Sequence, residues 1–594
     1  MQPPSTTRRI WLVVAILLLL AGLLLLAGFF APYEQMKPIV DHLAQDGSLE
    51  RFTPASLAQL KPGLLLAALG CFVTGGLVLY FREDLDRRLD GQLHASPRRA
   101  LIRDLKELGA GLRAEAHHKR ELGVLVIITL LAAGIRLLYL SQPMQHDEAY
   151  TFIAFASRSF WAAISDYALP NNHVFHTVLV YLAYHLLGNQ PWIVRLPAFL
   201  AGVAIIPLTY GAGAIFYNRK AGLLSAGLVA ASPLLIDYSA NARGYTLICA
   251  FTLCAVILAA YVIEHRNSIA WALLILACAL GFYTIPIMLY PAGMLVAWLA
   301  LSHLFGDTAQ DYKGRFWGYL AVSCLALAGL TVLLYTPVLI TSGISAVVNN
   351  SYVRPDDQAS LLGQVGSRVS NTAEQWTAGA PWGIGILSLI GFIASLVLHK
   401  RISHQKIPLQ AAALLWIGIA ISLQRVAPLA RVWMFLLPLY ITWASAGILG
   451  LFKLVIPRRF LPQAGNLVIL AAILIPGAVM IATIPRTESI RGAPGAEEGI
   501  ALYLHDHFQP GDSVAVKSPI STPLQYYFLR YGMPLEAFDT QKNQLQKLWV
   551  VVSRRYDQTL ESVAKRRGLE ALLPSTPSSP VYQYKHISLY ELRP

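Results

Sequence analysis

The chain has 594 residues, of which 55% are hydrophobic and 13% are charged, and its mean hydropathy is +0.52. Soluble domains carry about 25% charged residues, so this chain lacks the polar residues that several soluble domains would expose to water. The composition excludes a cytosolic enzyme, a DNA-binding protein and a disordered scaffold, and it predicts a membrane protein. The formal net charge of +14 then indicates basic cytoplasmic loops rather than a nucleic-acid partner. All five cysteines lie in apolar segments, where they are typical packing residues.

Apolar segments of about 20 residues, the length that crosses the hydrocarbon core of a membrane, recur along the chain. The first follows Arg8 and Arg9 and has no cleavage site, which predicts an uncleaved anchor with its amino terminus inside. About thirteen spans are predicted, at residues 10–31, 63–81, 122–141, 192–216, 221–236, 244–263, 268–284, 285–304, 316–341, 382–398, 409–424, 432–452 and 465–484.

The loops between these spans predict the orientation. The basic loops all fall on one side, at residues 82–121, 218–220, 264–266, 313–315, 399–401 and 453–459. Basic loops stay in the cytoplasm, so we expect a multi-pass protein of the plasma (inner) membrane with a cytoplasmic amino terminus. Residues 172–187 are apolar but short, and counting them as a span would invert every later loop. We therefore expect an interfacial helix on the outer face there.

Composition divides the chain into three parts. Residues 1–121 are a two-span extension with a basic cytoplasmic loop, and residues 122–484 form the membrane core, with outer-face loop helices at 142–190. Residues 485–594 are mixed in character and predict a small periplasmic or extracellular α/β domain. Its expected elements are a helix at 496–508, strands at 513–516 and 548–552, a helix at 560–567 and a hairpin at 581–592. The predicted fold class is a polytopic α-helical membrane protein with this α/β domain at its carboxyl end.

Three acids lie at the predicted outer boundary of the membrane. Asp147 and Glu148 directly follow the 122–141 span, where adjacent carboxylates are costly unless they are solvated, paired or metal-bound. Asp237 ends another span, although the negative end of a helix dipole disfavours a carboxylate. A solubilising acidic pair and a structural ion pair between Asp237 and Arg243 are the alternatives to a functional role.

Arginines also gather on this side, where basic residues should be scarce. A single arginine there snorkels to lipid headgroups, but a set of them indicates a phosphate, which guanidinium groups bind through paired hydrogen bonds. The set comprises Arg136, Arg195, Arg243, Arg425 and Arg431. A lipid-phosphate donor would place its tail in the bilayer and its phosphate on arginines, while an acid takes a proton from an acceptor hydroxyl.

Two histidines, His173 and His176, are one helical turn apart and are candidate metal ligands together with Asp147 or Glu148. Aromatic-like packing at the interface is the alternative interpretation. Further candidate contacts to a substrate or metal are Asn172 and Tyr238.

Four motifs resemble signatures of one family. They are QHDEAYT at 145–151, PNNHVFHT at 170–177, PWIVRLP at 191–197 and YSANARGY at 238–245. The first resembles the acidic motif in the first outer loop of the GT-C membrane glycosyltransferases. This superfamily includes protein O-mannosyltransferases, lipid A aminoarabinose transferases and bacterial RgtA/B/C/D-like members. The similarity is strongest over residues 122–265 and is compatible up to 484.

The resemblance implies an inverting transferase that moves a hexose or pentose from a polyprenyl-phosphate donor to a glycan, lipid or protein acceptor on the outer face. By this analogy Asp147 is the catalytic base, and Glu148 supports the site or binds a divalent metal together with His173. Asp237 is then an acceptor-side acid, and Arg243 and Arg431 hold the donor phosphate, with Arg195 and Arg425 as further candidates. The resemblance implies no certain cofactor.

The sequence also departs from the family. Many relatives carry glutamate where Asn241 stands, so a carboxylate role at that position is lost, and the two spans before residue 122 are additional. Two other functions remain open. An O-antigen ligase or polymerase also uses lipid-linked donors, and a transporter or flippase of polyprenyl-linked lipids would predict repeated halves and ionisable residues near the middle of the membrane.

Overall fold

The computed structural model describes residues 6–593 with gaps at 45–52, 91–96, 117–118, 168–170, 307, 309–312, 349–360, 380–381, 489–493, 540–545 and 568–578. Parts of two predicted loops, 82–121 and 142–190, therefore lie outside the described residues.

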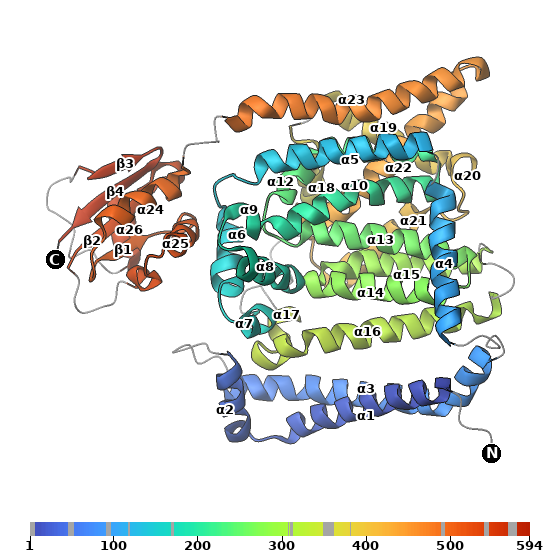
Figure 1. The fold of residues 1–594 in the computed structure, drawn as a ribbon, viewed down its shortest axis with the longest axis horizontal. Coiled ribbons are helices and arrows are strands. Elements are labelled where there is room, and N and C mark those ends of the chain that lie inside the picture. The colour runs from blue at the N-terminus through green and yellow to red at the C-terminus, as the bar shows by residue number, and fades with distance from the viewer. Residues whose placement is uncertain are drawn as a thin grey trace.

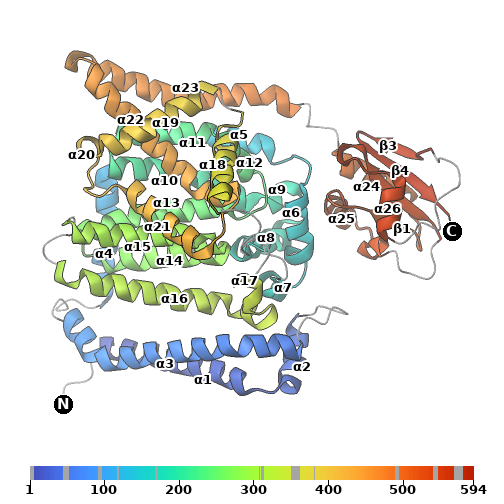
Figure 2. The same ribbon diagram turned by 180° about the vertical axis from the view of Figure 1, so that it is seen from behind.

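The membrane part is a bundle whose long helices run in roughly one direction (Figure 1). Seen from behind, the amino-terminal helices form a separate pair along one side of this bundle (Figure 2). The pair is α1 (Thr6–Phe30) and α3 (Pro54–Asp90), and α3 meets the rest of the bundle at α16. The bundle helices are α5 (Lys119–Tyr139), α10 (Leu196–Phe216), α11 (Arg219–Ala231), α13 (Tyr245–Glu264), α14 (Ser268–Thr284), α15 (Leu289–Leu304), α16 (Phe316–Thr341), α19 (Trp382–Val397), α21 (Leu409–Gln424), α22 (Leu436–Val455) and α23 (Leu461–Glu488).

Every predicted span falls on a helix, so the prediction of a polytopic helical membrane protein is confirmed. By length and composition, eight helices of the described chain are long and apolar enough to cross a membrane, or up to ten if each bent pair is one span. Three further predicted spans are α14, α19 and α21, which are apolar but have only 16 or 17 residues. The count of thirteen crossings stays a prediction.

The bundle interior is apolar and closely packed. Its largest buried cluster joins residues of α5, α10, α11, α13 to α16 and α21 to α23. The helices α10 and α11 touch where a Cβ on Gly213 would lie 2.7 Å from the Cα of Gly222, so only glycine permits this approach. Small residues that bring backbones together are the usual basis of helix packing in membranes.

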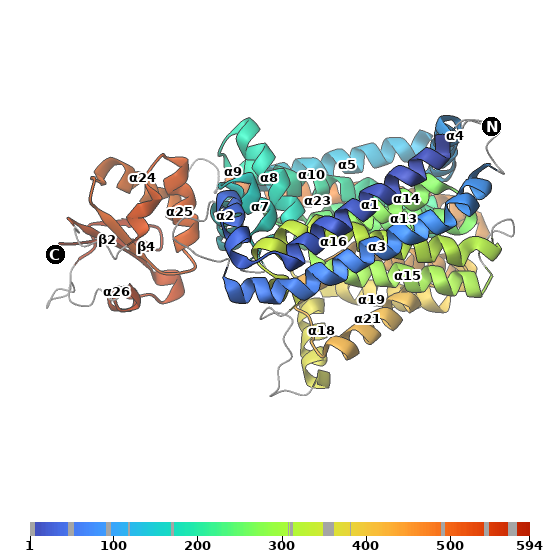
Figure 3. The same ribbon diagram turned by 90° about the horizontal axis from the view of Figure 1, so that it is seen from below.

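The two ends of the bundle differ. Helix α4 (Pro97–Ala116) lies across one end (Figure 1). The other end carries several short helices and lies next to the carboxyl-terminal domain; Figure 3 shows them from another side. They are α2 (Tyr33–Ala44), α6 (His146–Thr151), α7 (Phe160–Ser165), α8 (Val174–Leu187) and α9 (Pro191–Val194). The flank carries α18 (Leu361–Thr377), which packs against the 3-10 turn η4 (Ala430–Phe435).

A proline break positions part of this end. Helix α11 stops at Ala231, and α12 (Pro233–Ser239) continues at an angle of 63°. Pro233 has no amide hydrogen and restricts the residue before it, so the helix cannot run on straight. Arg136 of α5 holds the bend because its guanidinium donates to Ser239 Oγ at 3.0 Å and to the Ala230 carbonyl at 3.3 Å.

The carboxyl-terminal domain is a four-stranded sheet of order β1-β2-β4-β3 between helices. Strand β1 (Ser513–Val516) pairs in parallel with β2 (Leu548–Ser553), and β4 (Ile587–Leu592) pairs antiparallel with β2 and with β3 (Tyr582–Tyr584). Helices α24 (Ala496–His507) and α25 (Ser521–Arg530) pack on one face and α26 (Leu560–Arg567) on the other. The predicted α/β elements are present, but the sequence interpretation missed α25.

The carboxyl-terminal domain packs on the short helices at the end of the bundle. One buried cluster contains Ala149 and Phe152 of the bundle together with Leu524 and Tyr526 of α25. The rings of Phe152 and Tyr526 meet edge to face, with centroids 5.4 Å apart. The domain is therefore part of the wall around the short helix α6.

Candidate active site

The acidic motif forms the first turn of α6. The residue before the helix, Gln145, is extended, and the Glu148 side chain accepts its amide hydrogen bond at 2.9 Å. This arrangement satisfies one amide hydrogen at the helix start. Acidic residues are also favoured in a first turn by the helix dipole. The motif therefore folds locally so that Asp147 stands on the first turn with its side chain about half exposed.

The second part of the site is the turn between α12 and α13, which carries Asn241, Arg243 and Gly244. A Cβ on Gly244 would lie 2.4 Å from Thr284 Cγ2 and 3.2 Å from His173 Cβ. Only glycine fits there, and the Gly244 amide donates to His173 Nδ1 at 2.8 Å. The turn is thus pressed against the start of α8 and holds Arg243 beside α6.

A polar cavity of about 220 Å³ opens between these segments. Its lining comes from α6, from α12 and the turn after it, from the start of α13 and from η4. The lining residues are Gln145, His146, Asp147, Asp237, Tyr238, Asn241, Arg243, Tyr245 and Arg431. The cavity therefore contains two carboxylates and two guanidinium groups within the part of the chain that the structure describes.

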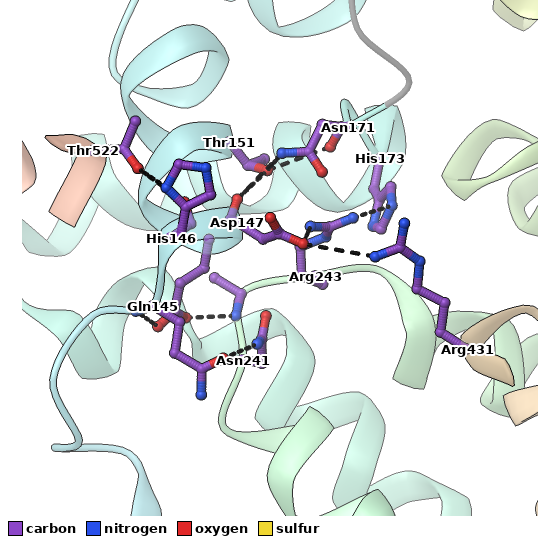
Figure 4. Close-up of polar contacts among 12 residues, drawn as sticks. Gln145, His146, Asp147, Thr151, Asn171, His173, Asn241, Arg243, Arg431 and Thr522 are labelled. Atoms are coloured by element: carbon purple, nitrogen blue, oxygen red, sulfur yellow. Dashed lines mark hydrogen bonds and ion pairs between the residues drawn. The ribbon is translucent and has the colours of Figure 1, made fainter. Parts of the chain in front are cut away.

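Asp147 faces both arginines of the cavity (Figure 4). Its Oδ2 lies 2.7 Å from Arg243 Nη1 and 3.9 Å from Arg431 Nη1. Arg243 is 4% exposed and also lies over the Tyr245 ring, whereas the Arg431 side chain is 32% exposed. Within the described residues, the buried Arg243 Nε has no hydrogen-bond partner.

His173 adds a second donor near Arg243. Burial and the nearby Arg243 charge hold the pKa of His173 well below its ordinary value, so the ring is neutral. Because Nδ1 accepts from Gly244, the ring hydrogen is on Nε2, which faces Arg243 Nη2 at 3.3 Å. Two donors cannot bond to each other, and an anionic oxygen near this pair would accept from both.

Glu148 and Arg195 form a fully buried ion pair that does not line the cavity. Arg195 Nε donates to Glu148 Oε2 at 3.0 Å, and the guanidinium also donates to the carbonyls of Leu140, Gln142 and Pro143. Glu148 Oε2 accepts from the Ala242 amide at 2.9 Å as well. The pair joins α6, the segment before it and the 240–244 turn, so it positions both walls of the cavity.

Asp237, Tyr238 and Asn241 line the same cavity. The Tyr238 ring packs edge to face on Tyr245, and Asn241 Nδ2 donates to Gln145 Oε1 at 3.1 Å. Asn241 thus ties the turn to the residue before α6.

Three predicted residues lie elsewhere. Asn172 is buried, donates to the carbonyls of Ala163 and Asp166 and accepts from Thr177, so its amide ties α7 to α8. His176 is buried, and neither ring nitrogen has a hydrogen-bond partner among the described residues. Arg425 is exposed at the end of α21 with φ 53°.

The proposed metal ligands do not converge. Glu148 is bonded to Arg195, and His173 Nδ1 accepts a hydrogen bond from the Gly244 amide. Across the described ranges, no group of three or more histidine, cysteine, aspartate or glutamate side chains is placed to hold a metal ion. The residues present therefore do not fit the metal site that Glu148 and His173 were predicted to form.

Four lining residues were not predicted as site residues: Gln145, His146, Asn241 and Tyr245. The signal for the first two was their place in the QHDEAYT motif beside Asp147. The signal for Asn241 and Tyr245 was their place in the YSANARGY motif beside Arg243, and Tyr245 lies here because α13 begins at the cavity.

Comparisons with known proteins agree with this architecture. The sequence model of the family described as dolichyl-phosphate-mannose-protein mannosyltransferase matches residues 174–335. None of the curated proteins matches.

Two solved structures share the fold. ArnT from Cupriavidus metallidurans bound to undecaprenyl phosphate has a TM-score of 0.54 and 13% identity, over 80% of this chain and 98% of that chain. The apo state of the same protein has a TM-score of 0.53 and 12% identity, over 79% and 98%. The chain is therefore similar to this mannosyltransferase family over residues 174–335 and shares its fold with ArnT, a similarity that agrees with the GT-C resemblance of its motifs.

Proposed function

We propose that the chain transfers a hexose or pentose from a polyprenyl-phosphate donor to a hydroxyl of a glycan, lipid or protein acceptor, with inversion at the anomeric carbon. The reaction takes place at the outer face of the plasma (inner) membrane, the amino terminus is cytoplasmic and the carboxyl-terminal domain is periplasmic or extracellular. The observation that carries this proposal is the Asp147 carboxylate beside Arg243 and Arg431 in one polar cavity.

The chemistry assigns a part to each group. The acceptor oxygen bonds to the anomeric carbon of the sugar while the bond from that carbon to the phosphate oxygen breaks. Asp147 takes the acceptor proton as general base. The leaving polyprenyl phosphate gains negative charge, and Arg243 and Arg431 stabilise it by charge-assisted hydrogen bonds. The leaving phosphate is a weak base and needs no general acid.

The choice of donor draws support from the fold relative, whose solved structure holds undecaprenyl phosphate. The spare donor on Arg243 Nε and the facing donors of Arg243 and His173 supply hydrogen bonds for such a phosphate. Asp237 lines the same cavity and serves as the second acid on the acceptor side. We assign Glu148 and Arg195 to positioning, because their buried pair leaves neither side chain in the cavity.

The test is turnover by the purified protein. With a polyprenyl-phosphate sugar and an envelope acceptor extracted from its host, the wild-type chain should release polyprenyl phosphate. Asp147→Asn keeps the shape of the side chain but removes the base, and we expect it to lower the rate by about 10²–10⁴-fold.

The matched control is Asp506→Asn, which changes an exposed acid of the carboxyl-terminal domain and should leave the rate unchanged. A folded Asp147→Asn protein that works at the wild-type rate would contradict the assignment of the base. A wild-type protein that releases no polyprenyl phosphate would contradict the reaction itself.

A further inference from the structure

The carboxyl-terminal domain contacts one residue of the cavity wall, His146, by hydrogen bonds. This residue is the first of α6, lines the cavity and precedes Asp147 in the chain. Its Nδ1 lies 2.8 Å from the carbonyl oxygen of Pro519 and 2.7 Å from Thr522 Oγ1. Thr522 also donates to the His146 carbonyl at 3.2 Å. Figure 4 shows the threonine on one side of the imidazole, away from Arg243 and Arg431.

These contacts determine where the ring hydrogen of a neutral His146 is. A carbonyl oxygen can only accept, so the contact with Pro519 requires a hydrogen on Nδ1. The Thr522 hydroxyl hydrogen is used on the His146 carbonyl, so the hydroxyl oxygen faces the same Nδ1 hydrogen. The neutral ring then carries a lone pair on Nε2, which can accept a hydrogen bond.

The surrounding contacts keep this geometry in place. Helix α25 is fixed to the bundle by three further hydrogen bonds. The Met144 amide donates to Tyr527 Oη at 3.2 Å, Tyr526 donates to the Asn189 carbonyl, and Arg530 donates to Gln190 Oε1 at 2.8 Å. The imidazole is therefore held by one domain while it lines a cavity of the other.

The other polar groups of the cavity show why a hydrogen-bond acceptor such as His146 Nε2 is useful there. Arginines only donate hydrogen bonds, and the Asp147 carboxylate already receives them from Arg243. Sugars present many hydroxyl donors. A neutral acceptor on the cavity wall suits a sugar hydroxyl without attracting the arginines that a phosphate needs.

We infer that His146 orients the carbohydrate substrate, with Nε2 accepting a hydrogen bond from a sugar hydroxyl, and that Pro519 and Thr522 position the ring for this task. The carboxyl-terminal domain thereby completes the active site. The inference rests on the proposed transferase function, and the sugar hydroxyl belongs either to the donor or to a glycan acceptor.

Three variants test it in a strain that lacks the chromosomal gene, with the missing envelope glycan measured by mass spectrometry. His146→Asn keeps an amide donor near the Nδ1 position but has no group at Nε2. Thr522→Val removes the hydroxyl with little change of shape, and Thr522→Ser retains it. We expect His146→Asn and Thr522→Val to lower the glycan formed per folded protein about tenfold, the scale of one hydrogen bond, and Thr522→Ser to restore it.

Undecaprenyl phosphate binding to the purified variants separates positioning from collapse of the site. Its Kd should stay within about twofold of wild type, because the arginines are untouched. Weakened binding together with a lowered unfolding temperature in both loss variants would overturn the inference, as would wild-type glycan levels in His146→Asn. If the wild-type gene restores no glycan, the transferase function fails, and the inference with it.

A second measurement shows whether the hydroxyl that His146 binds belongs to the donor sugar or to the acceptor. Purified protein given the undecaprenyl-phosphate sugar of its host membranes, without acceptor, is assayed for slow transfer to water. If His146→Asn lowers this hydrolysis as much as glycan transfer, the hydroxyl belongs to the donor sugar. If only glycan transfer falls, it belongs to the acceptor.

Discussion

The two arginines of the cavity differ in how firmly the protein holds them. Arg243 is almost fully buried and contacts Asp147 and the Tyr245 ring, whereas about a third of the Arg431 side chain is exposed. Arg243 therefore belongs to the buried wall of the cavity, and Arg431 is the more accessible of the two arginines. Replacing either side chain should therefore have a different effect on phosphate binding and on stability.

We predict that Arg431→Ala weakens undecaprenyl phosphate binding about tenfold, because it removes one charge-assisted contact to the phosphate. The unfolding temperature should hardly change. The Kd can be measured by titration of the purified protein in detergent.

Arg425→Ala is the matched control, since Arg425 lies on the same predicted side but does not line the cavity. Equal Kd values for wild type and Arg431→Ala would remove Arg431 from the phosphate site. A large increase in this Kd for Arg425→Ala would show that Arg425 does bind the phosphate, as the sequence predicted.

His176 predicts a pH dependence of stability. Burial and the Arg243 charge lower its pKa from 6.5 to about 3. Above pH 6.5 the His176 ring is mostly neutral in both the folded and the unfolded chain. Below pH 6.5 the unfolded chain binds a proton that the folded chain cannot, so folding loses up to about 1.4 kcal/mol per pH unit until the pH nears 3.

His176→Leu should remove this loss. Between pH 7 and pH 5, we expect the free energy of unfolding of the variant to rise by about 2 kcal/mol relative to that of wild type. The difference between the two unfolding temperatures should therefore grow as the pH falls. If the unfolding temperatures of wild type and variant change in parallel with pH, His176 is protonated in the folded protein as readily as in the unfolded chain.

At the residue scale, the sequence predicted several of the charged groups near the cavity, but it did not predict which of them form ion pairs with each other. Five of the predicted residues line one cavity: Asp147, Asp237, Tyr238, Arg243 and Arg431. Glu148 and Arg195 were predicted from the same motifs and neutralise each other in the interior instead. Adjacent carboxylates point in different directions from a helix turn, and sequence spacing alone does not reveal which one meets a buried cation.

At the scale of elements, the buried Glu148–Arg195 pair fastens α6 to its surroundings. Breaking one partner of a buried pair leaves an uncompensated charge. We predict that Glu148→Gln destabilises the protein by about 3 kcal/mol or more, measured as a lower unfolding temperature in detergent micelles.

Glu591→Gln is the control, because Glu591 pairs with a largely exposed arginine and such pairs contribute about 0–1 kcal/mol. If Glu148→Gln unfolds at the wild-type temperature but loses turnover, Glu148 acts in the chemistry, as the family resemblance implied.

Element boundaries were predictable where hydropathy changes abruptly and not where geometry decides. The strands β1 and β2 lie where apolar runs end at turn residues. The bend at Pro233 divides one predicted span into α11 and α12 and carries Asp237 and Tyr238 to the cavity. Helix α25 was missed because its apolar residues pack both on its own sheet and on the bundle, which blurs a one-sided helical pattern.

On the scale of the whole molecule, orientation in the membrane is the main prediction. Asn218 and the first residues of α11, Arg219 and Lys220, should face the cytoplasm. In a variant whose five native cysteines are replaced, Arg219→Cys should resist an impermeant thiol reagent applied to intact cells.

A cysteine at the exposed Asp506 should be labelled in the same cells, because the carboxyl-terminal domain is expected outside. Labelling at residue 219 together with protection at 506 would invert the molecule and place the cavity on the cytoplasmic side.

The contact between His146 and the carboxyl-terminal domain has a consequence for biosynthesis. The partners of this histidine lie 373 and 376 residues later in the chain. At about 5–20 residues per second, the ribosome delivers them tens of seconds after α6 has been made. A nascent chain that stops after α23 would have all its bundle helices but an unfinished catalytic wall. Under the proposed function, such a chain would be inserted but would transfer sugar poorly, so full activity would follow only once translation has supplied the carboxyl-terminal domain.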